Sequence, residues 1–518
     1  MNHDRTSSSR ETDQSAVLRF LADAEPGAQR IDTHASIVFL GKERVLKIKR
    51  AVRLPFLDYS TPDKRRRACE EELKVNIPFA PRLYRRVVPI THGKAGLAID
   101  GTGIPVEWAV EMARFDETRS LDRIAAAAEI PPTLAASLAD AIDDAHHKAA
   151  PAQGISWLNS IAEIIDRNTA RFRSARGLSG DAVDRLDALS HAAHGAQASL
   201  LAARADAGWV RHCHGDLHLG NIVLIDDKPV LFDAIEFDPV IATTDILYDL
   251  AFPLMDLFRF GQAAAANALF NRYFGMANEA NRNALALLPL FLSMRAAIRA
   301  HVLFTKSEQS EDDTSAWNEA KRYFDLAVRL IDPEPPCMVA VGGLSGTGKS
   351  VASRAIAPLL GPPPGALILR SDVIRKARFG VAETTHLPPS AYEPAVTGLV
   401  YQALMDHARH TAEQGCSVVL DSAFLRGTER AAFAATPPAA VRHIGLFLEA
   451  DRPTRLARIE ARRKDASDAS DATAAVAVVQ EAMTEGDLDW PRIDANGTPA
   501  ETLARCMPYL PTINAADT

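Results

Sequence analysis

One eight-residue segment restricts the fold of this 518-residue chain more than any other feature. It reads Gly343-Leu344-Ser345-Gly346-Thr347-Gly348-Lys349-Ser350 and fits G-x-x-x-x-G-K-[ST] at every fixed position. An apolar run, Met338–Val341, precedes it, and a helical pattern, Ser350–Leu360, follows it. Glycines let the backbone turn tightly, so that N–H groups surround a phosphate at the N-terminus of the following helix. The segment therefore predicts a phosphate-binding loop between a buried strand and a helix.

The residues of this loop and of one later strand fit ATP with Mg²⁺. The Lys349 ammonium can reach the β- and γ-phosphate oxygens, and the Ser350 hydroxyl can bind the metal. A second apolar strand, Val418–Asp421, ends in a carboxylate, as a strand does when its last Asp orients the metal ligands; a surface turn is the alternative for Asp421. We expect residues 343–351, up to Val351, to bind the nucleotide, and Ser350 and Asp421 to hold Mg²⁺.

Two further patterns indicate transfer of a phosphoryl group to a substrate. Asp372 follows the predicted strand Leu367–Arg370, and strand ends of an open α/β sheet face the ligand crevice. Asp372 is therefore a candidate base for a substrate hydroxyl, with a helix N-cap as the alternative. Arg458 and Arg462 are four residues apart and share one helix face, where they could close over the phosphates. A solvated basic face is the alternative for each arginine.

The region from about Met338 to the C-terminus resembles the small-molecule P-loop kinases, such as gluconate kinase, chloramphenicol phosphotransferase and the zeta-toxin relatives. The resemblance rests on the glycine-rich loop, Ser371-Asp372-x-x-Arg375, Asp421, and Arg458-x-x-x-Arg462 followed by 468–472. It implies that Asp372 is the catalytic base and that Arg458 and Arg462 contact the nucleotide phosphates. A GTPase is a poorer reading, because we find no Asn-Lys-x-Asp motif downstream.

A second informative segment lies in the front half. It reads His214-Gly215-Asp216-Leu217-His218-Leu219-Gly220-Asn221. This is the H-x-D-x-x-x-x-N spacing of a kinase catalytic loop, in which the Asp receives the substrate proton and the Asn holds Mg²⁺. Two short predicted strands, Ile222–Ile225 and Pro229–Phe232, then lead to Asp233. There Asp233 occupies the place of a metal-binding carboxylate.

This segment resembles the catalytic loop of the aminoglycoside phosphotransferase-like family. The resemblance implies a bilobal protein-kinase-like fold, with Asp216 as the base and with Asn221 and Asp233 as Mg²⁺ ligands. It also implies a strand lysine that pairs with nucleotide phosphates, for which Lys47 is favoured over Lys49 on the same strand face.

The resemblance implies two more features of the small lobe. A helix glutamate should pair with the strand lysine, and the candidates are Glu70, Glu71 and Glu72, with Glu71 as the first choice. Glu111-Met112 resembles the hinge whose backbone holds adenine. The sequence departs from protein kinases in that no glycine-rich loop precedes Lys47.

Proline placement and the hydrophobic pattern predict two domains. Residues 1–15 are polar and are expected to form a disordered tail. Residues 16–331 are expected to form the kinase-like α+β domain, with a small β-rich lobe to about residue 113 and a helical lobe after it. The proline-rich stretch 332–337 is expected to be a linker. Residues 338–518 are expected to form an α/β P-loop NTPase domain with a parallel sheet.

Composition excludes several function classes. The net charge is −8 and the pI is about 6.0, so no basic field attracts nucleic acid or anionic lipid. The five cysteines are scattered and never form a Cys-x-x-Cys pair, which favours a reducing compartment. No uninterrupted apolar run is long enough to span a bilayer. We therefore expect a cytoplasmic protein with small-molecule partners and with neither a nucleic-acid nor a membrane partner; the oligomeric state is unknown.

The two halves together resemble a bacterial group of fused proteins, in which an aminoglycoside phosphotransferase-like domain precedes an ATP-binding kinase-like domain. The first hypothesis is a bifunctional phosphotransferase that uses ATP and Mg²⁺ to phosphorylate hydroxyl groups of small molecules. One alternative is a P-loop kinase or ATPase that a non-catalytic kinase-like sensor regulates. Another is an ATPase switch in which hydrolysis drives domain motion.

Overall fold

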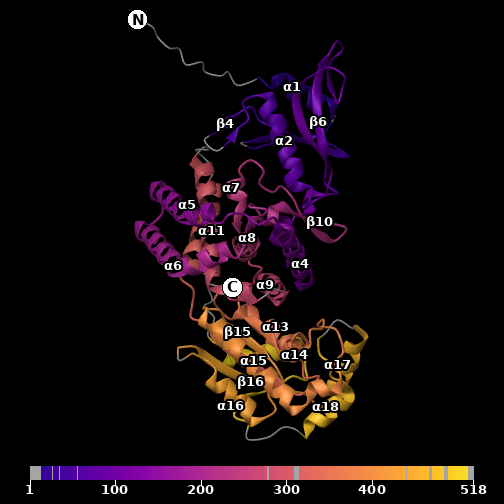
Figure 1. Cartoon of the computed structure of the whole chain (residues 1–518), viewed down its shortest axis with the longest axis vertical. Coiled ribbons are helices and arrows are strands. Elements are labelled where there is room, and N and C mark those ends of the chain that lie inside the picture. Colours follow the sequence, from indigo (N-terminus) through magenta and orange to yellow (C-terminus); the bar gives the residue numbers. More distant parts are fainter. Residues whose placement is uncertain are drawn as a thin grey trace. The chain divides into compact units, whose positions relative to one another are not determined.

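The computed structural model describes residues 13–25, 27–33, 35–54, 57–276, 279–308, 314–438, 440–465, 469–482 and 488–511. The chain forms two compact units. The first contains residues 1–130, 140–163 and 198–256, and the second contains residues 131–139, 164–197 and 257–518. Figure 1 follows the chain through these elements.

The first unit is built on a six-stranded antiparallel sheet with the order β1-β2-β3-β8-β6-β7. Its strands are β1 (Gln29–Asp32), β2 (Ser36–Leu40), β3 (Arg44–Lys49), β6 (Tyr84–Gly93), β7 (Gly96–Ile99) and β8 (Ile104–Ala113). Side chains alternate across β3: Leu46 and Ile48 face a cluster with Val17 and Leu21 of α1 (Ser15–Ala24), whereas Val45 faces α2 (Pro62–Asn76). Each face of the sheet is therefore covered by one helix.

The N-terminal tail was predicted to extend to residue 15, and most of it, residues 1–12, lies outside the described residues. Its last residues, 13–15, are described, and Gln14 binds residues of the first unit. The Gln14 side chain donates hydrogen bonds to Lys49 O at 2.9 Å and to Glu107 Oε2 at 2.7 Å, and it accepts one from Ala51 N–H at 2.8 Å. Helix α1 begins directly after it, at Ser15.

Short elements of the first unit surround the predicted catalytic loop 214–221. These elements are β4 (Arg53–Leu54), β5 (Leu57–Asp58), η1 (Glu117–Arg119), α3 (Leu121–Ala127), β9 (Val210–His212), η2 (Leu219–Asn221), β10 (Ile222–Ile225), β11 (Lys228–Leu231), α7 (Pro239–Ala242) and β12 (Thr243–Asp245). Strands β10 and β11 pair as a hairpin. Its turn residues Asp226 and Asp227 have φ of 51° and 59°, the left-handed geometry that suits a tight hairpin. The hairpin predicted from the sequence is confirmed.

The remaining helices that precede the parallel sheet are divided between the two units, and several of them have residues in both. They are α4 (Pro132–Lys148), α5 (Ile155–Ser174), α6 (Gly180–Asp206), α8 (Ile246–Arg259), α9 (Ala263–Met276), α10 (Glu279–Arg282), η3 (Leu285–Leu287), α11 (Leu288–Glu308) and α12 (Thr314–Ile331). Among the described residues, one stretch, Glu279–Glu308, is long and apolar enough to cross a bilayer, but 67% of its apolar window is buried in the fold. The sequence analysis did not single out this stretch.

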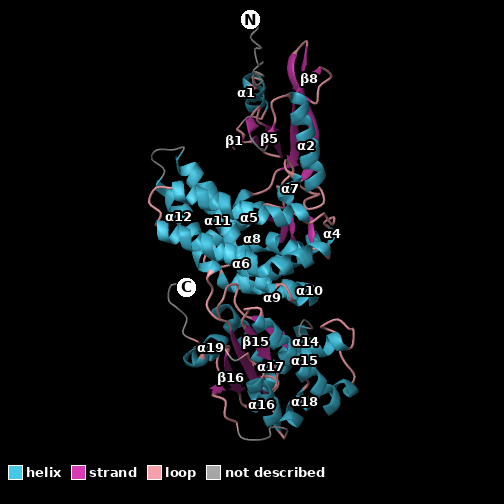
Figure 2. Cartoon of the chain, turned by 60° about the vertical axis from the view of Figure 1, so that its left-hand side comes forward, coloured by secondary structure: helices cyan, strands magenta, loops and turns pink. Residues whose placement is uncertain are grey.

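The back part of the second unit is a five-stranded parallel sheet with the order β14-β15-β13-β16-β17. The strands are β13 (Cys337–Gly343), β14 (Leu367–Arg370), β15 (Val418–Asp421), β16 (Arg442–Glu449) and β17 (Arg492–Asp494). Apolar clusters cover both faces, and helices lie on both sides of the strands in Figure 2. The helical elements are α13 (Lys349–Ile356), η4 (Ala357–Leu359), α14 (Ser371–Arg378), η5 (Pro389–Tyr392), α15 (Pro394–Glu413), α16 (Gly427–Ala435), α17 (Arg452–Asp465), α18 (Ala474–Glu481), α19 (Pro499–Cys506) and η6 (Met507–Tyr509).

The predicted fold class is confirmed: an antiparallel small lobe and helices are followed by a parallel-sheet nucleotide-binding fold. Residues 332–336 of the predicted linker 332–337 lie between α12 and β13, and its last residue, Cys337, begins β13. The compact units, however, place the helices after residue 257 together with the parallel sheet. The predicted domain boundaries therefore stay a prediction.

Candidate active sites

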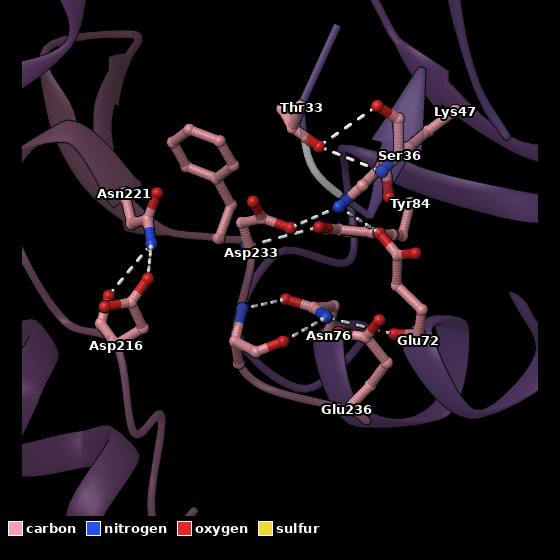
Figure 3. A network of polar contacts seen from close by, with 12 residues as sticks. Thr33, Ser36, Lys47, Glu72, Asn76, Tyr84, Asp216, Asn221, Asp233 and Glu236 are labelled. Carbon is pink, nitrogen blue, oxygen red and sulfur yellow. Dashed lines mark hydrogen bonds and ion pairs between the residues drawn. The ribbon is translucent and has the colours of Figure 1, made fainter. Parts of the chain in front are cut away.

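The first candidate site centres on Lys47 of β3, whose ammonium meets two carboxylates (Figure 3). Lys47 Nζ lies 2.8 Å from Glu72 Oε1 and 2.5 Å from Asp233 Oδ1. Burial alone would lower the pKa of Lys47, but Asp233 and Glu72 outweigh it and hold this pKa well above its ordinary value. Burial alone would raise the pKa of Asp233, but the Lys47 ammonium outweighs burial, and this pKa is lowered. The pair is ionised at neutral pH.

The partner of Lys47 on α2 is Glu72, so the prediction of Glu71 is wrong. Glu72 is fully buried and also lies 2.7 Å from Lys49 Nζ, whereas Glu71 is exposed and pairs with Lys74 at 2.8 Å. The buried positions of α2 are Arg65, Cys69, Glu72 and Asn76. Their spacing defines a single helix face, and Glu71 lies one residue, about 100°, away from it.

The segment that carries Asp233 is fixed by hydrogen bonds from α2 and β6. Asp233 has a φ of 62°, a left-handed conformation that Asp tolerates better than most residues. Its N–H donates to the Tyr84 hydroxyl at 3.2 Å. The Asn76 side chain accepts from Ala234 N–H at 2.7 Å and donates to Ala234 O at 3.3 Å. Glu236, three residues after Asp233, pairs with Lys49. These contacts direct the Asp233 carboxylate at Lys47.

The predicted base and one predicted metal ligand are in direct contact. The Asn221 amide donates to Asp216 O at 2.9 Å and to Asp216 Oδ2 at 3.2 Å. The Asp216 side chain is 41% exposed, so a substrate hydroxyl can reach it. Figure 3 shows Asp216 and Asn221 beside the segment that carries Asp233. The structure thus brings the residues predicted at 214–221 and at 233 into one site.

Two buried aspartates that the sequence analysis missed hold the backbone of this loop. Gly215 N–H donates to Asp249 Oδ1 at 2.9 Å, and Leu219 N–H donates to Asp256 Oδ2 at 3.0 Å. Asp249 also meets His146 Nε2 at 3.3 Å. A signal was available, because Asp249 and Asp256 are seven residues apart on an apolar helix and so share a face.

Met112, the predicted hinge residue, lies inside the sheet. Its side chain is buried, and its register partners are Val45 on β3 and Tyr84 on β6. Strand β8 ends one residue later, at Ala113, whose N–H donates to Leu83 O at 2.7 Å. A backbone contact from Met112 to adenine stays a prediction.

Replacing Glu72 with glutamine is expected to weaken Mg·ATP binding at this site about 10- to 100-fold, because Lys47 and Lys49 lose the carboxylate that orients them. Nucleotide titration in a Lys349→Ala background isolates this site from the P-loop. Glu71→Gln is the matched control and should bind like its parent, since Glu71 is exposed. Equal losses in both variants would contradict the assignment of Glu72.

The second candidate site is the glycine-rich loop between β13 and α13. Gly346 and Gly348 have φ of 85° and 92°, and a Cβ at Gly346 would lie 2.5 Å from Arg455 O. Both positions therefore require glycine. Lys349 Nζ donates to Leu344 O at 3.1 Å within the loop. Burial lowers the pKa of Lys349, although Asp421 and Asp372 oppose this effect. Val351 follows on α13 and is exposed.

The two predicted metal-binding side chains meet at the end of this loop. The Ser350 hydroxyl donates to Asp421 Oδ2 at 2.5 Å, and Asp421 is buried at the end of β15. Arg370 Nε, at the end of the neighbouring strand β14, lies 3.3 Å from the same oxygen. A strand end, and not a surface turn, carries Asp421.

Asp372 lies in the first turn of α14, next to the end of β14. The N-cap residue of this helix is Arg370, so the N-cap alternative for Asp372 does not hold. Burial raises the pKa of Asp372; Arg370 and Lys349 lower it and Asp421 raises it further. The carboxylate is therefore within electrostatic reach of the P-loop lysine and of the predicted metal ligand.

The two predicted lid arginines bind backbone carbonyls. Arg458 Nη1 donates to Thr347 O at 3.3 Å and Arg458 Nη2 to Gly497 O at 2.9 Å. Arg462 Nη2 donates to Ala472 O at 3.3 Å, and its charge reaches Lys349. Arg458 is thus bound to the glycine-rich loop and Arg462 to the segment before α18, and the contact of both side chains with phosphate stays a prediction.

Helix α18 also touches the loop, which the sequence analysis missed. Ser345 N–H donates to Gln480 Oε1 at 2.9 Å. The next residue, Glu481, pairs with Arg452 and Arg455 of α17. The contact joins residues 135 positions apart, and no local pattern marks it.

The fold and the two sites define a phosphotransferase with a kinase-like front half and a P-loop nucleotide-binding back half. Residues 11–288 match the model of the phosphotransferase enzyme family, which spans more than half of the chain, and residues 338–485 match an AAA domain. The chain belongs to the phosphotransferase enzyme family.

Its relatives among curated proteins are described as uncharacterized. One from Mycobacterium tuberculosis (strain ATCC 25618 / H37Rv) and one from Mycobacterium bovis (strain ATCC BAA-935 / AF2122/97) are each 28% identical over 406 residues. The matches cover 77% of this chain and 78% of each relative.

Several solved structures are also similar. A choline/ethanolamine kinase family protein from Mesorhizobium loti is 12% identical over 61% of this chain and 96% of its own, with a TM-score of 0.36. Wild-type aminoglycoside 2′-phosphotransferase-IIIa is 11% identical over 61% and 99%, with a TM-score of 0.38. A sugar kinase from Janibacter sp. HTCC2649 is 21% identical over 35% and 98%, with a TM-score of 0.26.

Proposed function

We propose that this chain is a bifunctional phosphotransferase, with two sites that each move the γ-phosphoryl group of ATP to a hydroxyl of a small molecule. The observation that supports it is the repetition of one set of groups at two places. Each site holds a lysine, an aspartate as candidate base, and oxygen side chains that suit a metal. In the first site these are Lys47, Asp216 and Asn221 with Asp233; the second site has Lys349, Asp372 and Ser350 with Asp421.

The donor atoms of both sites fit Mg²⁺. They are carboxylate, amide and hydroxyl oxygens, which this hard cation prefers. The 2.5 Å contact between Ser350 and Asp421 shows two such oxygens already converging on one point. When bound, Mg²⁺ would neutralise charge on the phosphate oxygens. Asn221 and Asp233 would hold it in the first site, and Ser350 and Asp421 in the second.

In the first site the chain positions the acceptor and receives its proton. The acceptor oxygen bonds to the γ-phosphorus, the bond from that phosphorus to the β,γ-bridging oxygen breaks, and the hydroxyl proton passes to the Asp216 carboxylate. The Asn221 amide holds Asp216 in place through its 2.9 and 3.2 Å hydrogen bonds. Lys47, held by Glu72, supplies a fixed positive charge for the nucleotide phosphates.

In the second site the loop N–H groups and Lys349 hold the phosphates, while Asp372 receives the acceptor proton. The raised pKa of Asp372 suits a base that must take up a proton during transfer. We propose small-molecule acceptors for both sites and, from the scattered cysteines, a cytoplasmic location. Transfer of label from γ-labelled ATP to a panel of small alcohols tests this function. A chain that only hydrolyses ATP would contradict it.

Transfer at the P-loop site should be restricted to a pH range with an acid limit set by Asp372 and an alkaline limit set by Lys349. Asp372 must be ionised, and its pKa is raised, so kcat/KM is lost as pH falls through a value above about 3.9, the ordinary aspartate pKa. Lys349 must be charged, and its pKa is lowered, so kcat/KM is lost as pH rises through a value below about 10.4. A pH profile of kcat/KM checks both limbs. An acid limb that persists in Asp372→Asn would contradict the role of Asp372.

A further inference from the structure

Strand β14 forms the open edge of the parallel sheet, and a helix from the front half of the chain covers it. On one side β14 pairs with β15; on its other side no strand pairs with it among the described residues. Helix α9 lies there, within the same compact unit. Edge strands present unpaired N–H and C=O groups that need partners.

The side chain of Asn271 on α9 takes the place of a neighbouring strand. Its Oδ1 accepts from Ile368 N–H at 2.7 Å, and its Nδ2 donates to Ala366 O at 3.0 Å. These two backbone groups flank Leu367 and lie on one edge of the strand. A parallel strand would bond the same pair, a C=O and the N–H two residues later. The Asn271 amide thus makes the same two hydrogen bonds that one residue of a neighbouring parallel strand would make.

Asn267, one helical turn earlier, fixes the turn that enters β14. Its Nδ2 donates to Pro364 O at 3.0 Å and to Ala366 O at 3.1 Å, and its Oδ1 accepts from Asn271 Nδ2 at 3.0 Å. Asn267 is 3% exposed. Gly365 has a φ of 91°, and a Cβ there would lie 2.7 Å from Asn267 Nδ2. The turn is therefore shaped around this amide.

The strand held in this way runs directly into the P-loop site. Arg370 ends β14 and contacts Asp421, and Asp372 follows two residues later. Asp372 lies only four positions after Ile368, so a shift of the strand carries over to the carboxylate. We propose that Asn271, supported by Asn267, is a positioning residue for Asp372. This inference rests on the proposed role of Asp372 as the base.

The inference makes the P-loop site dependent on the kinase-like half of the chain. Helix α9 lies outside residues 338–518, the domain predicted to carry that site. Asn271→Leu removes both strand hydrogen bonds at similar side-chain volume. We expect hydrogen exchange to speed up in the segment 366–370, and kcat for P-loop-dependent transfer to fall about 10- to 100-fold, as for a misplaced catalytic group. KM for ATP should change little, because the loop follows β13 at the centre of the sheet.

Two further variants separate positioning from plain stability. Asn283→Ala removes a 2.9 Å hydrogen bond to His410 of α15 in the same unit. Asn283 lines a pocket together with Leu369, but this hydrogen bond does not involve the β14 backbone, so its loss should leave kcat unchanged. Asn271→Asp keeps the acceptor for Ile368 N–H and loses the donor, so its kcat should lie between those of wild type and Asn271→Leu. If Asn271→Leu does not fold, the test is the kcat of Asn271→Asp compared with that of Asn283→Ala, and only the kcat of Asn271→Asp should be lowered.

Each readout can overturn the inference separately. Unchanged exchange at 366–370 would refute the strand contact. Faster exchange with unchanged kcat, or an equal loss of kcat in Asn283→Ala, would refute positioning. Exchange is measured on the full chain without substrate. Absence of any transfer in wild type would therefore refute the proposed function and the role of Asn271 in it, while the strand contact would still be decided by exchange.

Discussion

Replacing Lys349 with alanine is expected to lower transfer at the P-loop site by about 10²- to 10³-fold, the range for losing one preorganised charge-stabilising group. Lys349 stands at the N-terminus of α13 and within electrostatic reach of Asp421 and Asp372. No other described lysine occupies the loop. Product formation from γ-labelled ATP, under saturating ATP, measures the effect. Transfer at the first site should be unchanged.

Lys74→Ala controls for the loss of a lysine charge. The Lys74 side chain is 75% exposed and pairs with Glu71 on the helix surface, where an ion pair contributes little. It should leave both activities unchanged. If Lys349→Ala keeps full transfer at every acceptor, the glycine-rich loop is not a catalytic nucleotide site.

Replacing Asp216 with asparagine is expected to lower transfer at the first site by about 10²- to 10⁴-fold, the contribution typical of general base catalysis. The asparagine oxygen can still accept the Asn221 hydrogen bond, so the change removes basicity and leaves the shape of the loop. The same labelled-ATP assay measures the loss, and ATP binding should persist.

The matched control for this charge change is Asp227→Asn. Asp227 lies in the β10–β11 turn with 88% of its side chain exposed and pairs with Arg119 on the surface. Its replacement should have no effect on transfer. A first-site activity that survives Asp216→Asn would contradict the role of Asp216 as the base and assign proton transfer to another group.

Much of this architecture could be predicted because its signals are local. The strands 222–225, 367–370 and 418–421 have the bounds expected from their apolar runs. Lys47 and Asp233 lie 186 positions apart, and both were assigned to one site only through the family resemblance; their direct contact was not predicted. The glycine-rich loop 343–350 connects β13 to α13, as expected from its local motif and from the apolar run before it.

The sequence-based predictions were wrong or missing where the packing of one element on another determines which residue is buried or bonded. Three consecutive glutamates, 70–72, differ only in helix phase, and the buried face of α2 selects Glu72. That face could have been read from Cys69 and its helical spacing. Asn271 gave no such signal, because a polar residue on a helix reads as solvated until the edge of β14 is placed against it.

The central claim is that one chain carries two separable phosphotransferase sites. The most direct test is a panel of metabolites and aminoglycosides with γ-labelled ATP, run on wild type, Lys349→Ala and Asp216→Ala. The account predicts phosphorylated products that divide into two sets, one lost only in Lys349→Ala and the other lost only in Asp216→Ala. No product with any acceptor, together with ATP hydrolysis that is lost only in Lys349→Ala, would contradict it and indicate a P-loop ATPase with a silent kinase-like module.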